Sequence, residues 1–544
     1  MIKYVSVAEM VAIEKEADSS GLSYALMMEN AGKGLAEATH TAYSQYKSRG
    51  ALGLVGSGNN GGDTLVALAI MAAWGWRVNA YIVRPRPLDD PLVARLLQAG
   101  GAVYLGEEDK NFRQLAGLLH AHSVVLDGVL GTGVRLPLKK EVAKALEAAR
   151  QILQEVADIH IVAVDCPSGV DCDSGDAAPE CIRAELTVSM AAAKRGLLKF
   201  PAYSFVGDMR FTGIGLGETG AYPTAWQSID RFIVDDEWVS HIIPARPLDA
   251  YKGTFGTALI VAGSLNYTGA ALLAGKASYR SGTGLVTLAV PYPLHAALAG
   301  QFPEATWLLL PEEEGAISEY AAEVVGENLE RVTAMLVGPG FGLQETTRKF
   351  IDRLLSGGVK SARGGIGFTS GTAKVVTSDR INLPPMVFDA DGLKLLARLP
   401  DWPDLLPKQT VLTPHPGEMA VLTGLSTKEI QESRVEIAER FAQEWGHVLV
   451  LKGAFTVLAA PDRRTAVIPV ASPALARAGT GDVLAGLIVG LRAQGVEAFS
   501  AAATGAWIHA QAGLRAARAR KSTAAVLAGD VLEWVSEVMG EVST

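Results

Sequence analysis

Four residues in the last fifth of the chain, Gly479-Thr480-Gly481-Asp482, have the types and spacing that phosphoryl transfer needs. Small residues directly before a helix leave backbone N–H groups free to surround a phosphate. An aspartate at the start of that helix can take the proton of a hydroxyl beside the phosphate. An aspartate there can also serve only the helix dipole. The small-residue run favours catalysis by Asp482, with a helix predicted over Val483–Leu491.

Two other strand ends of the second half carry polar residues, Thr413–Glu418 (TPHPGE) and Lys452–Thr456 (KGAFT). No Walker A sequence is present, since Gly269–Lys276 has one residue too many and no Ser or Thr after the lysine. We therefore expect the strand-end segments to hold a nucleotide. Glu418 is a candidate to organise a hydrated magnesium ion. His415 is a candidate for substrate contact, or else a structural hydrogen-bonding group.

The first half contains a glycine turn, Gly56–Asp63 (GSGNNGGD), between a predicted strand and a predicted helix. Its G-x-G-x-x-G spacing is typical of a turn that brings a pyrophosphate to a helix N-terminus. A dehydrogenase also needs an acidic residue at the end of the next strand, and here that strand ends Val83-Arg84-Pro85. The sequence therefore predicts nucleotide binding without a simple dehydrogenase, and a turn that serves only packing is the alternative.

Two further strands of the first half end in aspartate. Asp127 begins DGVLGTG, a second glycine loop, and Asp165 lies in VDCPSGVD. Carboxyl ends of parallel strands meet at one sheet edge, so these carboxylates and the glycine turn predict a single site there. Asp165 is the leading acid/base candidate, and Asp171 and Lys194 are weaker ones.

The elements that must position these residues follow one rhythm of short apolar strands and intervening helices. In the first half we predict a helix over Asp63–Trp74 and strands over Leu52–Val55, Val78–Val83, Val124–Leu126 and Ile161–Val164. In the second half we predict a helix from Thr268 to Arg280 and strands over Thr257–Ala262, Leu285–Val290, Ala334–Val337, Met386–Phe388, Val411–Thr413 and Val448–Leu451. The turn-rich segment Gly217–Asp230 separates the two series. The sequence thus predicts an α/β protein with two domains, residues 1–222 and 223–544.

Composition limits the class of protein. Hydrophobic residues make up 49% of the 544 residues and charged residues 20%, as in ordinary globular enzymes. The net charge of -9 argues against nucleic-acid binding. The first residues lack a signal-peptide core, and no apolar stretch is long enough to span a membrane. Three cysteines give no disulfide framework, and we interpret them as structural. These features predict a cytoplasmic enzyme with no membrane or nucleic-acid partner.

The motifs GSGNNGGD, DGVLGTG, VDCPSGVD and AAAKRGLL together resemble the NAD(P)H-hydrate epimerase domain, a Rossmann-like fold, over about residues 1–217. The resemblance implies a potassium ion surrounded by Asn60, Asp127 and Ser168, which are hard oxygen ligands. From sequence alone, a cap role for Ser168 is the alternative. The residues that the resemblance implies for hydrate binding are Asn59, Asn60, Gly61, Gly62, Asp63, Gly131, Thr132, Gly133, Val134, Arg135, Leu136, Pro137 and Asp165.

The second half resembles the ribokinase-like superfamily and, more narrowly, the ADP-dependent (S)-NAD(P)H-hydrate dehydratase. The resemblance covers about Val234–Val538 and includes KGTFGTALIVAGS, YTGA, GPGFG, LTPHPGE, LKG and GTGD. The kinase superfamily's N-x-x-E appears here as His415-Pro416-Gly417-Glu418, which fits the dehydratase branch better than a sugar or vitamin kinase. The implied hydrate contacts are Ala270, Gly340, His415 and Asp482. The implied ADP or AMP contacts are Lys452, Gly453, Ala454, Phe455, Thr456 and Gly481.

The resemblance implies a bifunctional repair enzyme for hydrated NADH and NADPH. One half would interconvert the R and S hydrates, and the other would use ADP and Mg²⁺ to dehydrate the S hydrate, giving AMP and phosphate. We also expect a homo-oligomer. A vitamin or sugar kinase fused to a dinucleotide-binding module and a non-enzymatic nucleotide sensor remain as alternatives.

Overall fold

The computed structural model describes residues 2–87, 89–217, 222–357 and 381–543. They form two compact units, Ile2–Ile233 and Val234–Thr544, and each is described by itself. The division between the units falls after Ile233, later in the chain than the boundary expected after residue 222. Part of the expected linker, residues 218–221, lies outside the described residues.

The first unit is built on a fully parallel sheet of seven strands, which confirms its α/β, Rossmann-like prediction. The strands lie in the order β4-β3-β2-β5-β6-β7-β9, so the first predicted strand, β2, lies next to the central strand β5. Their bounds are Ala102–Leu105, Val78–Ile82, Ala51–Val55, Val124–Gly128, His160–Val164, Leu186–Met190 and Asp208–Thr212. The short β1 (Ile2–Val5) pairs with β8 (Ala193–Lys194).

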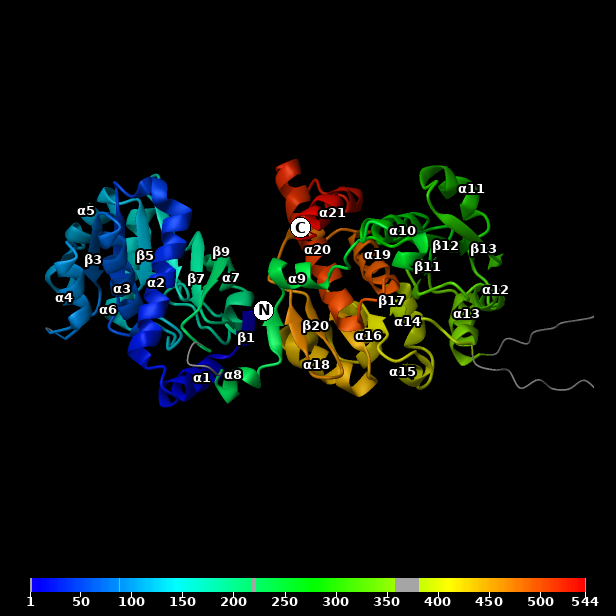
Figure 1. Cartoon of the computed structure of the whole chain (residues 1–544), viewed down its shortest axis with the longest axis horizontal. Coiled ribbons are helices and arrows are strands. Elements are labelled where there is room, and N and C mark those ends of the chain that lie inside the picture. Colours follow the sequence, from blue (N-terminus) through cyan, green and yellow to red (C-terminus); the bar gives the residue numbers. More distant parts are fainter. Residues whose placement is uncertain (1, 88, 218–221, 358–380, 544) are drawn as a thin grey trace, which may run out of the picture. The chain divides into compact units, whose positions relative to one another are not determined.

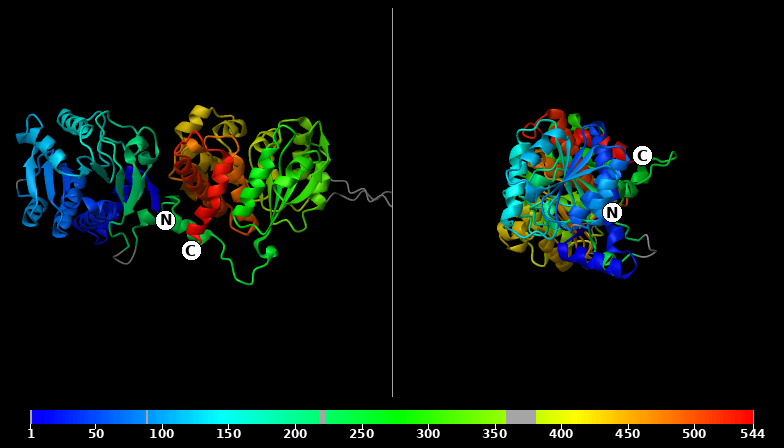
Figure 2. Two further views of the ribbon diagram at one scale, coloured as in Figure 1. Left: turned by 90° about the horizontal axis from the view of Figure 1, so that it is seen from above. Right: turned by 90° about the vertical axis from the view of Figure 1, so that its left-hand side faces the viewer.

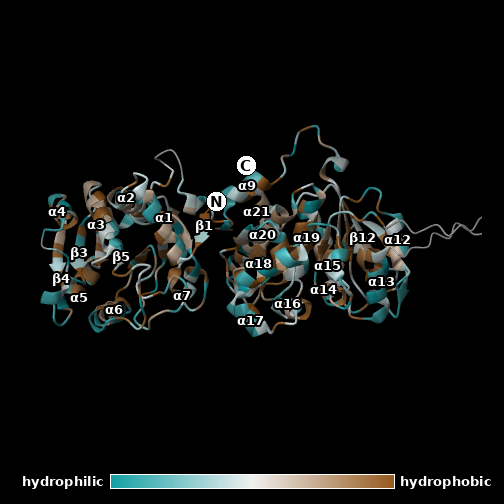
Figure 3. Ribbon diagram, turned by 90° about the horizontal axis from the view of Figure 1, so that it is seen from below, coloured by the Kyte–Doolittle hydropathy of each residue, from teal (hydrophilic) through white to brown (hydrophobic). Residues whose placement is uncertain are grey.

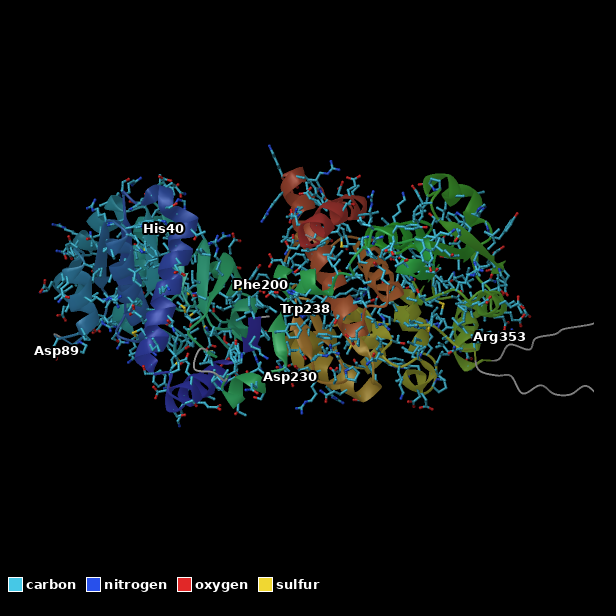
Figure 4. The ribbon with its side chains drawn as sticks, in the orientation of Figure 1. His40, Asp89, Phe200, Asp230, Trp238 and Arg353 are labelled. Carbon is cyan, nitrogen blue, oxygen red and sulfur yellow. The ribbon has the colours of Figure 1, made fainter. Side chains whose placement is uncertain are left out.

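Helices cover both faces of this sheet (Figures 1 and 2). Ala51 and Val55 pack with α1 (Val7–Ser19), α2 (Tyr24–Tyr43), α3 (Asn59–Ala73) and α4 (Pro91–Gln98). Leu52 and Leu54 pack with α5 (Arg113–Ala121) and α6 (Lys140–Leu153). On α2, His40 (labelled in Figure 4) accepts a hydrogen bond from Trp76 Nε1 at 3.1 Å. A strand buried on both sides explains the continuous apolar runs in the sequence.

The second unit has a larger sheet in the order β13-β12-β11-β16-β17-β18-β19-β20-β21. The first seven strands of this order, from β13 through β12 to β19, are parallel to one another. Strand β20 pairs antiparallel with β19, and β21 pairs antiparallel with β20. The bounds are Thr306–Leu310, Leu285–Pro291, Thr257–Val261, Ala334–Val337, Met386–Phe388, Val411–Leu412, Val448–Leu451, Val457–Ala459 and Thr465–Val467. Every strand predicted for this half is present.

Two helical layers enclose the second sheet (Figure 1). One layer contains α10 (Gly269–Arg280), α19 (Thr480–Ala493), α20 (Ala498–Arg520) and α21 (Ala528–Val542). The other contains α12 (Ala321–Glu327), α13 (Glu345–Ser356), α14 (Asp391–Leu396), α16 (Pro416–Thr423), α17 (Thr427–Glu432) and α18 (Arg434–Trp445). Within the described parts of the chain, no helix is long and apolar enough to cross a membrane.

The most extensive helix packing among the described residues joins α10 to α19. Residues Val483–Leu491 of α19 are all buried, and the helix is largely apolar (Figure 3). A Cβ atom on Gly486 would lie 2.3 Å from the Ala274 carbonyl oxygen and 2.8 Å from its Cα atom. Only glycine therefore permits this separation of the two backbones. The packing aligns the beginnings of α10 and α19, because Gly479 lies against Leu273.

We expect Gly486→Ala to lower the free energy of unfolding by roughly 1–3 kcal/mol, because the new methyl group must push α10 away from α19. Gly540→Ala in α21 is the matched control, since no atom lies within 4 Å of its added Cβ. That control should leave stability unchanged or raise it by up to about 1 kcal/mol. Urea unfolding of the two variants measures the difference, and equal effects would contradict the packing argument.

Candidate active sites

The glycine turn of the first unit lies against the second glycine loop, and the glycines make this approach possible. A Cβ on Gly56 would lie 1.9 Å from the Val129 carbonyl oxygen, and one on Gly131 would lie 2.3 Å from Asn60 Oδ1. The helix α3 begins at Asn59, so the predicted binding residues Asn59–Asp63 form its first turn. Its N-terminal amides therefore face the carboxyl edge of the sheet, where an anion is favoured.

Asn60, Asp127 and Ser168 are brought together at this edge. Asn60 Nδ2 donates to the carbonyl oxygens of Leu130 (3.2 Å) and Val164 (2.5 Å). The Asp127 carboxylate is fully buried and accepts from Ser168 Oγ at 2.6 Å and Ser168 N at 2.9 Å. Burial raises the pKa of Asp127, and the hydrogen bonds from Ser168 oppose that shift. Asp127 has no cationic partner among the described residues, and a buried carboxylate beside the oxygens of Asn60 and Ser168 has the ligand types that a hard cation prefers.

Asp165 holds the buried ammonium of Lys194. Lys194 Nζ contacts the Asp165 carboxylate, donates to the Met190 carbonyl at 2.8 Å, and is 1% exposed. The Met190 N–H donates to Asp165 Oδ1 at 2.9 Å. The φ of Asp165 is +65°, in the left-handed region that non-glycine residues rarely adopt. Lys194 therefore fixes the carboxylate of Asp165.

Asp63 and Glu14 carry acidic groups into the same cluster. Asp63 lies one turn after Asn60 on α3 and is 6% exposed. Burial raises its pKa well above the usual range, and the charges of Asp165 and Glu14 raise it further. Burial also raises the pKa of Glu14, while Lys194 lowers it. Burial and the neighbouring carboxylates thus favour the protonated forms of Asp63 and Glu14.

The remaining first-half candidates are the loop after Gly131, Asp171 and the cysteines. The predicted loop Thr132–Pro137 follows Gly131 directly and is half-buried to exposed. Asp171 Oδ1 accepts from the backbone amides of Asp173 and Ser174, so Asp171 stabilises a turn. The three cysteines are buried thiols in a small apolar cluster.

In the second unit, the GTGD residues form the start of α19. Gly479 caps the helix with φ of +89°, and Asp482 is its third residue. The pKa of Asp482 is raised to about 7, first by burial and then by Asp389, while Lys452 opposes the shift. Asp482 therefore lies among other carboxyls at the carboxyl edge of the sheet, where a base with a pKa near neutrality can act.

Lys452 is the cation of this cluster. Its Nζ lies 2.6 Å from Asp389 Oδ1 and 3.6 Å from Glu418 Oε2. Thr413 Oγ1 donates to the same Asp389 oxygen at 2.7 Å. A Cβ on Gly481 would lie 3.5 Å from Lys452 Nζ, so the lysine reaches the beginning of α19. Strands β17, β18 and β19 thus deliver one charged network to the GTGD turn.

His415 and Glu418 form the cap of α16. His415 Nδ1 accepts from the amides of Gly417 and Glu418, and Glu418 Oε2 accepts from His415 N at 2.9 Å. Burial lowers the pKa of His415. Since Nδ1 accepts, the neutral ring carries its proton on Nε2, which lies 3.3 Å from Glu418 Oε1. Half of the His415 side chain remains exposed and available to a ligand.

Ala270 and Gly340 lie next to one another. A Cβ on Gly340 would be 2.9 Å from the Ala270 Cβ and 2.8 Å from the Tyr267 carbonyl oxygen. Ser264 Oγ donates to the Gly340 carbonyl at 2.8 Å and fixes the loop. Thr268 precedes α10, as predicted, but its side chain makes no capping hydrogen bond.

The residues of the turn Lys452–Thr456 differ in their exposure. Lys452 points into the charged network, Gly453 and Ala454 are exposed, and Phe455 is buried with φ of +54°. Thr456 Oγ1 donates to the Gly453 carbonyl at 3.0 Å. The exposed backbone of this turn is the part open to a nucleotide.

Two residues of these charged clusters were not predicted from the sequence. Asp389 directly follows a predicted strand, Met386–Phe388, and that position was its only signal. Glu14 lies on α1, outside any motif, and has no local signal at all. No group of three or more His, Cys, Asp or Glu side chains suited to a metal ion occurs among the described residues.

Two cavities lie at the opposite, amino edges of the sheets. One of about 490 Å³ is lined by His160 and Glu185, and another of about 480 Å³ by Trp445 and His447. Neither includes a residue of the charged clusters.

Comparisons with known proteins cover both halves. Residues 25–196 match the family described as YjeF-related protein N-terminus, and residues 258–360 and 364–535 match NAD(P)H-hydrate dehydratase. A bifunctional NAD(P)H-hydrate repair enzyme of Moorella thermoacetica is 36% identical, covering 98% of this chain and 96% of the relative. The enzyme of that description from Escherichia coli is 31% identical over 97% of this chain and 92% of its own. A Bacillus subtilis ADP/ATP-dependent NAD(P)H-hydrate dehydratase, co-crystallized with ATP/Mg²⁺, is 29% identical with a TM-score of 0.46, covering 57% of this chain and 98% of its own.

We expect Lys452→Met to lower the free energy of unfolding at pH 8 by about 3–5 kcal/mol, because it leaves Asp389 and Glu418 buried without a cation. Lys428→Met is the control, since Lys428 is 82% exposed beside Glu432 and should matter by less than about 0.5 kcal/mol. Guanidinium unfolding of the two variants gives the comparison, and equal losses of stability would contradict the charge argument.

Proposed function

The chain belongs to the family of bifunctional NAD(P)H-hydrate repair enzymes, and from that premise we propose how its two halves divide the repair. We assign residues 1–222 as the epimerase domain for R and S hydrates of NADH and NADPH. We assign residues 223–544 as the domain that dehydrates the S hydrate with ADP. The observation that carries the proposal is Asp482, which lies at the beginning of α19 with a pKa of about 7.

In the first half, epimerisation inverts a carbon that bears a hydroxyl beside the ring nitrogen. The hydroxyl must leave and return, and its departure needs a proton. Asp165, held by Lys194, is the acid/base candidate at this edge. Asp63 supports the assignment as a neighbouring proton carrier, since burial and adjacent carboxylates raise its pKa. Asn59–Asp63, with the loop Gly131–Pro137, would hold the dinucleotide at the N-terminus of α3.

A potassium ion fits the cluster of Asn60, Asp127 and Ser168. The buried Asp127 carboxylate supplies negative charge, and the carbonyl oxygens of Leu130 and Val164 lie around the Asn60 amide. Oxygen ligands of this kind suit a hard cation. The ion would neutralise Asp127 and hold the two glycine loops in place.

In the second half, we assign Asp482 as the base that removes the proton of the hydrate's hydroxyl. The oxygen then forms a bond to the β-phosphorus of ADP, and the bond to the bridging oxygen breaks to release AMP. The phosphate leaves the carbon with the bonding pair, assisted by the lone pair of the ring nitrogen. Loss of a proton from the ring restores the double bond. Amides of Gly479–Gly481 would stabilise the transferring group.

The nucleotide would lie along the Lys452–Thr456 turn and Gly481, with Ala270, Gly340 and His415 contacting the hydrate. Mg²⁺ would be held mainly by phosphates and water, because Lys452 already engages Asp389 and Glu418. When bound, the ion would neutralise phosphate charge. We also propose ADP as the phosphoryl donor. We propose a cytoplasmic location, with which the three free thiols are consistent. The homo-oligomer stays a prediction.

We expect Asp127→Ala to reduce epimerisation strongly and to leave ADP-dependent dehydration of pure S hydrate almost unchanged. Loss of the buried carboxylate should weaken potassium binding and loosen the adjacent loop. Both rates are measured on one preparation by the return of reduced-nicotinamide absorbance, so dehydration is the internal control. An equal fall in both activities would show that the sites are not separate.

Asp482→Asn keeps the size of the side chain but removes the base, so we expect dehydration to fall about a hundred- to ten-thousand-fold. In the unsubstituted enzyme, only the ionised form is a base. Because the folded-state pKa is about 7, the rate should fall about tenfold per pH unit below 7. Asp482→Asn should lose this pH dependence while ADP binding and epimerisation persist. A folded variant that dehydrates near the original rate would falsify the assignment.

A further inference from the structure

Arg434 lies against the turn that we assign to the nucleotide, although no motif includes it. It is the first residue of α18, and its Nη2 donates to the carbonyl oxygens of Leu451 (2.8 Å) and Lys452 (3.3 Å). A Cβ on Gly453 would lie 3.0 Å from Nη1. The guanidinium therefore lies directly beside the exposed part of the turn.

No carboxylate among the described residues balances the charge of Arg434. Its partners are two backbone carbonyls and the neutral side chain of Gln431, at 2.9 Å from Nη1. Its Nε is buried and has no hydrogen-bond partner among the described residues. Burial alone lowers the pKa of Arg434 to about 10, so it stays charged at neutral pH. Other arginines of this unit, such as Arg348 and Arg515, pair with carboxylates.

The position of Arg434 in the first turn of α18 makes its unpaired positive charge still less favourable. A cation in the first turn of a helix meets the positive end of the helix dipole, which is unfavourable. The neighbouring Lys452, by contrast, is matched by Asp389 and Glu418. The positive charge left over at this turn is thus that of Arg434, together with the N-terminus of α18. Such a charge is stabilised by an anion.

We propose that Arg434 binds the phosphate groups of the adenine nucleotide in the second-half site. The proposal rests on the nucleotide site assigned above and adds a residue to it. A guanidinium can form paired, charge-assisted hydrogen bonds with phosphate oxygens, which an ammonium cannot copy. Bracing of the Leu451–Gly453 backbone is the purely structural alternative, and it gives no preference for phosphorylated ligands.

Binding of ADP, AMP and adenosine, measured by isothermal titration calorimetry, separates the two roles. Arg434→Met should weaken the binding of ADP and AMP about ten- to hundred-fold, which corresponds to the loss of a hydrogen bond to a charged group. Adenosine should bind within about twofold of the unsubstituted enzyme. Arg434→Lys keeps the positive charge but not the paired N–H donors of the guanidinium, so its affinity for ADP and AMP should lie between those of the unsubstituted enzyme and Arg434→Met. Arg440→Gln, on the same helix with a 64% exposed side chain, should change nothing.

Equal weakening of all three ligands, or unchanged ADP binding in Arg434→Met, would overturn the proposal. Thermal unfolding of each variant checks that the fold is retained, and Arg434→Lys carries the test if Arg434→Met does not fold. In turnover assays, the KM for ADP should rise more than kcat falls. Failure of the unsubstituted enzyme to bind ADP, AMP or ATP would overturn the nucleotide site itself, a result distinct from a failure at Arg434.

Discussion

A lysine ammonium buried against an aspartate at the carboxyl edge of a parallel sheet underlies both candidate sites. Lys194 pairs with Asp165 in the first unit and Lys452 with Asp389 in the second. Each pair costs desolvation energy that only close contacts offset. Lys194 engages Asp165, and Lys452 engages Asp389 and Glu418. Asp63 and Asp482 lie in the same low-dielectric surroundings with no ion pair to a lysine among the described residues. The pKa of Asp63 and of Asp482 therefore rises, which suits the proton-transfer roles that we propose for them.

Much of the fold followed from sequence because buried parallel strands read as unbroken apolar runs. Some strands that escaped prediction break this pattern. In β7, Thr187 and Ser189 interrupt the apolar residues, yet both are buried because Thr187 Oγ1 donates to Val206 O at 2.6 Å and Ser189 Oγ to Ala192 O at 3.1 Å. The edge strand β9 is only partly buried and mixes charged with apolar residues, whereas the edge strand β4 is apolar but has only four residues. The hydrogen bonds that allow Thr187 and Ser189 to be buried cannot be predicted from the periodicity of apolar residues.

The candidate sites were accessible from sequence where a motif lies at the end of a strand, as for Asp127 and Asp165, or where small residues precede a helix, as for the GTGD turn. Their electrostatic partners are brought by tertiary packing. Asp389 meets a lysine 63 positions later, and Glu14 reaches its cluster from the first helix. The pKa of each proton-transfer group depends on these non-local neighbours, so no motif can predict it.

The two units, each with its own sheet and its own charged site, are encoded as one polypeptide. Translation therefore produces the two active sites in a fixed one-to-one ratio that gene expression cannot alter. The relative rates of the two halves can therefore be changed only by conditions that act on the protein after its synthesis. With Asp482 as the proposed base and a pKa of about 7, a shift in cellular acidity would change the rate of the second half on the timescale of a proton exchange rather than of protein synthesis.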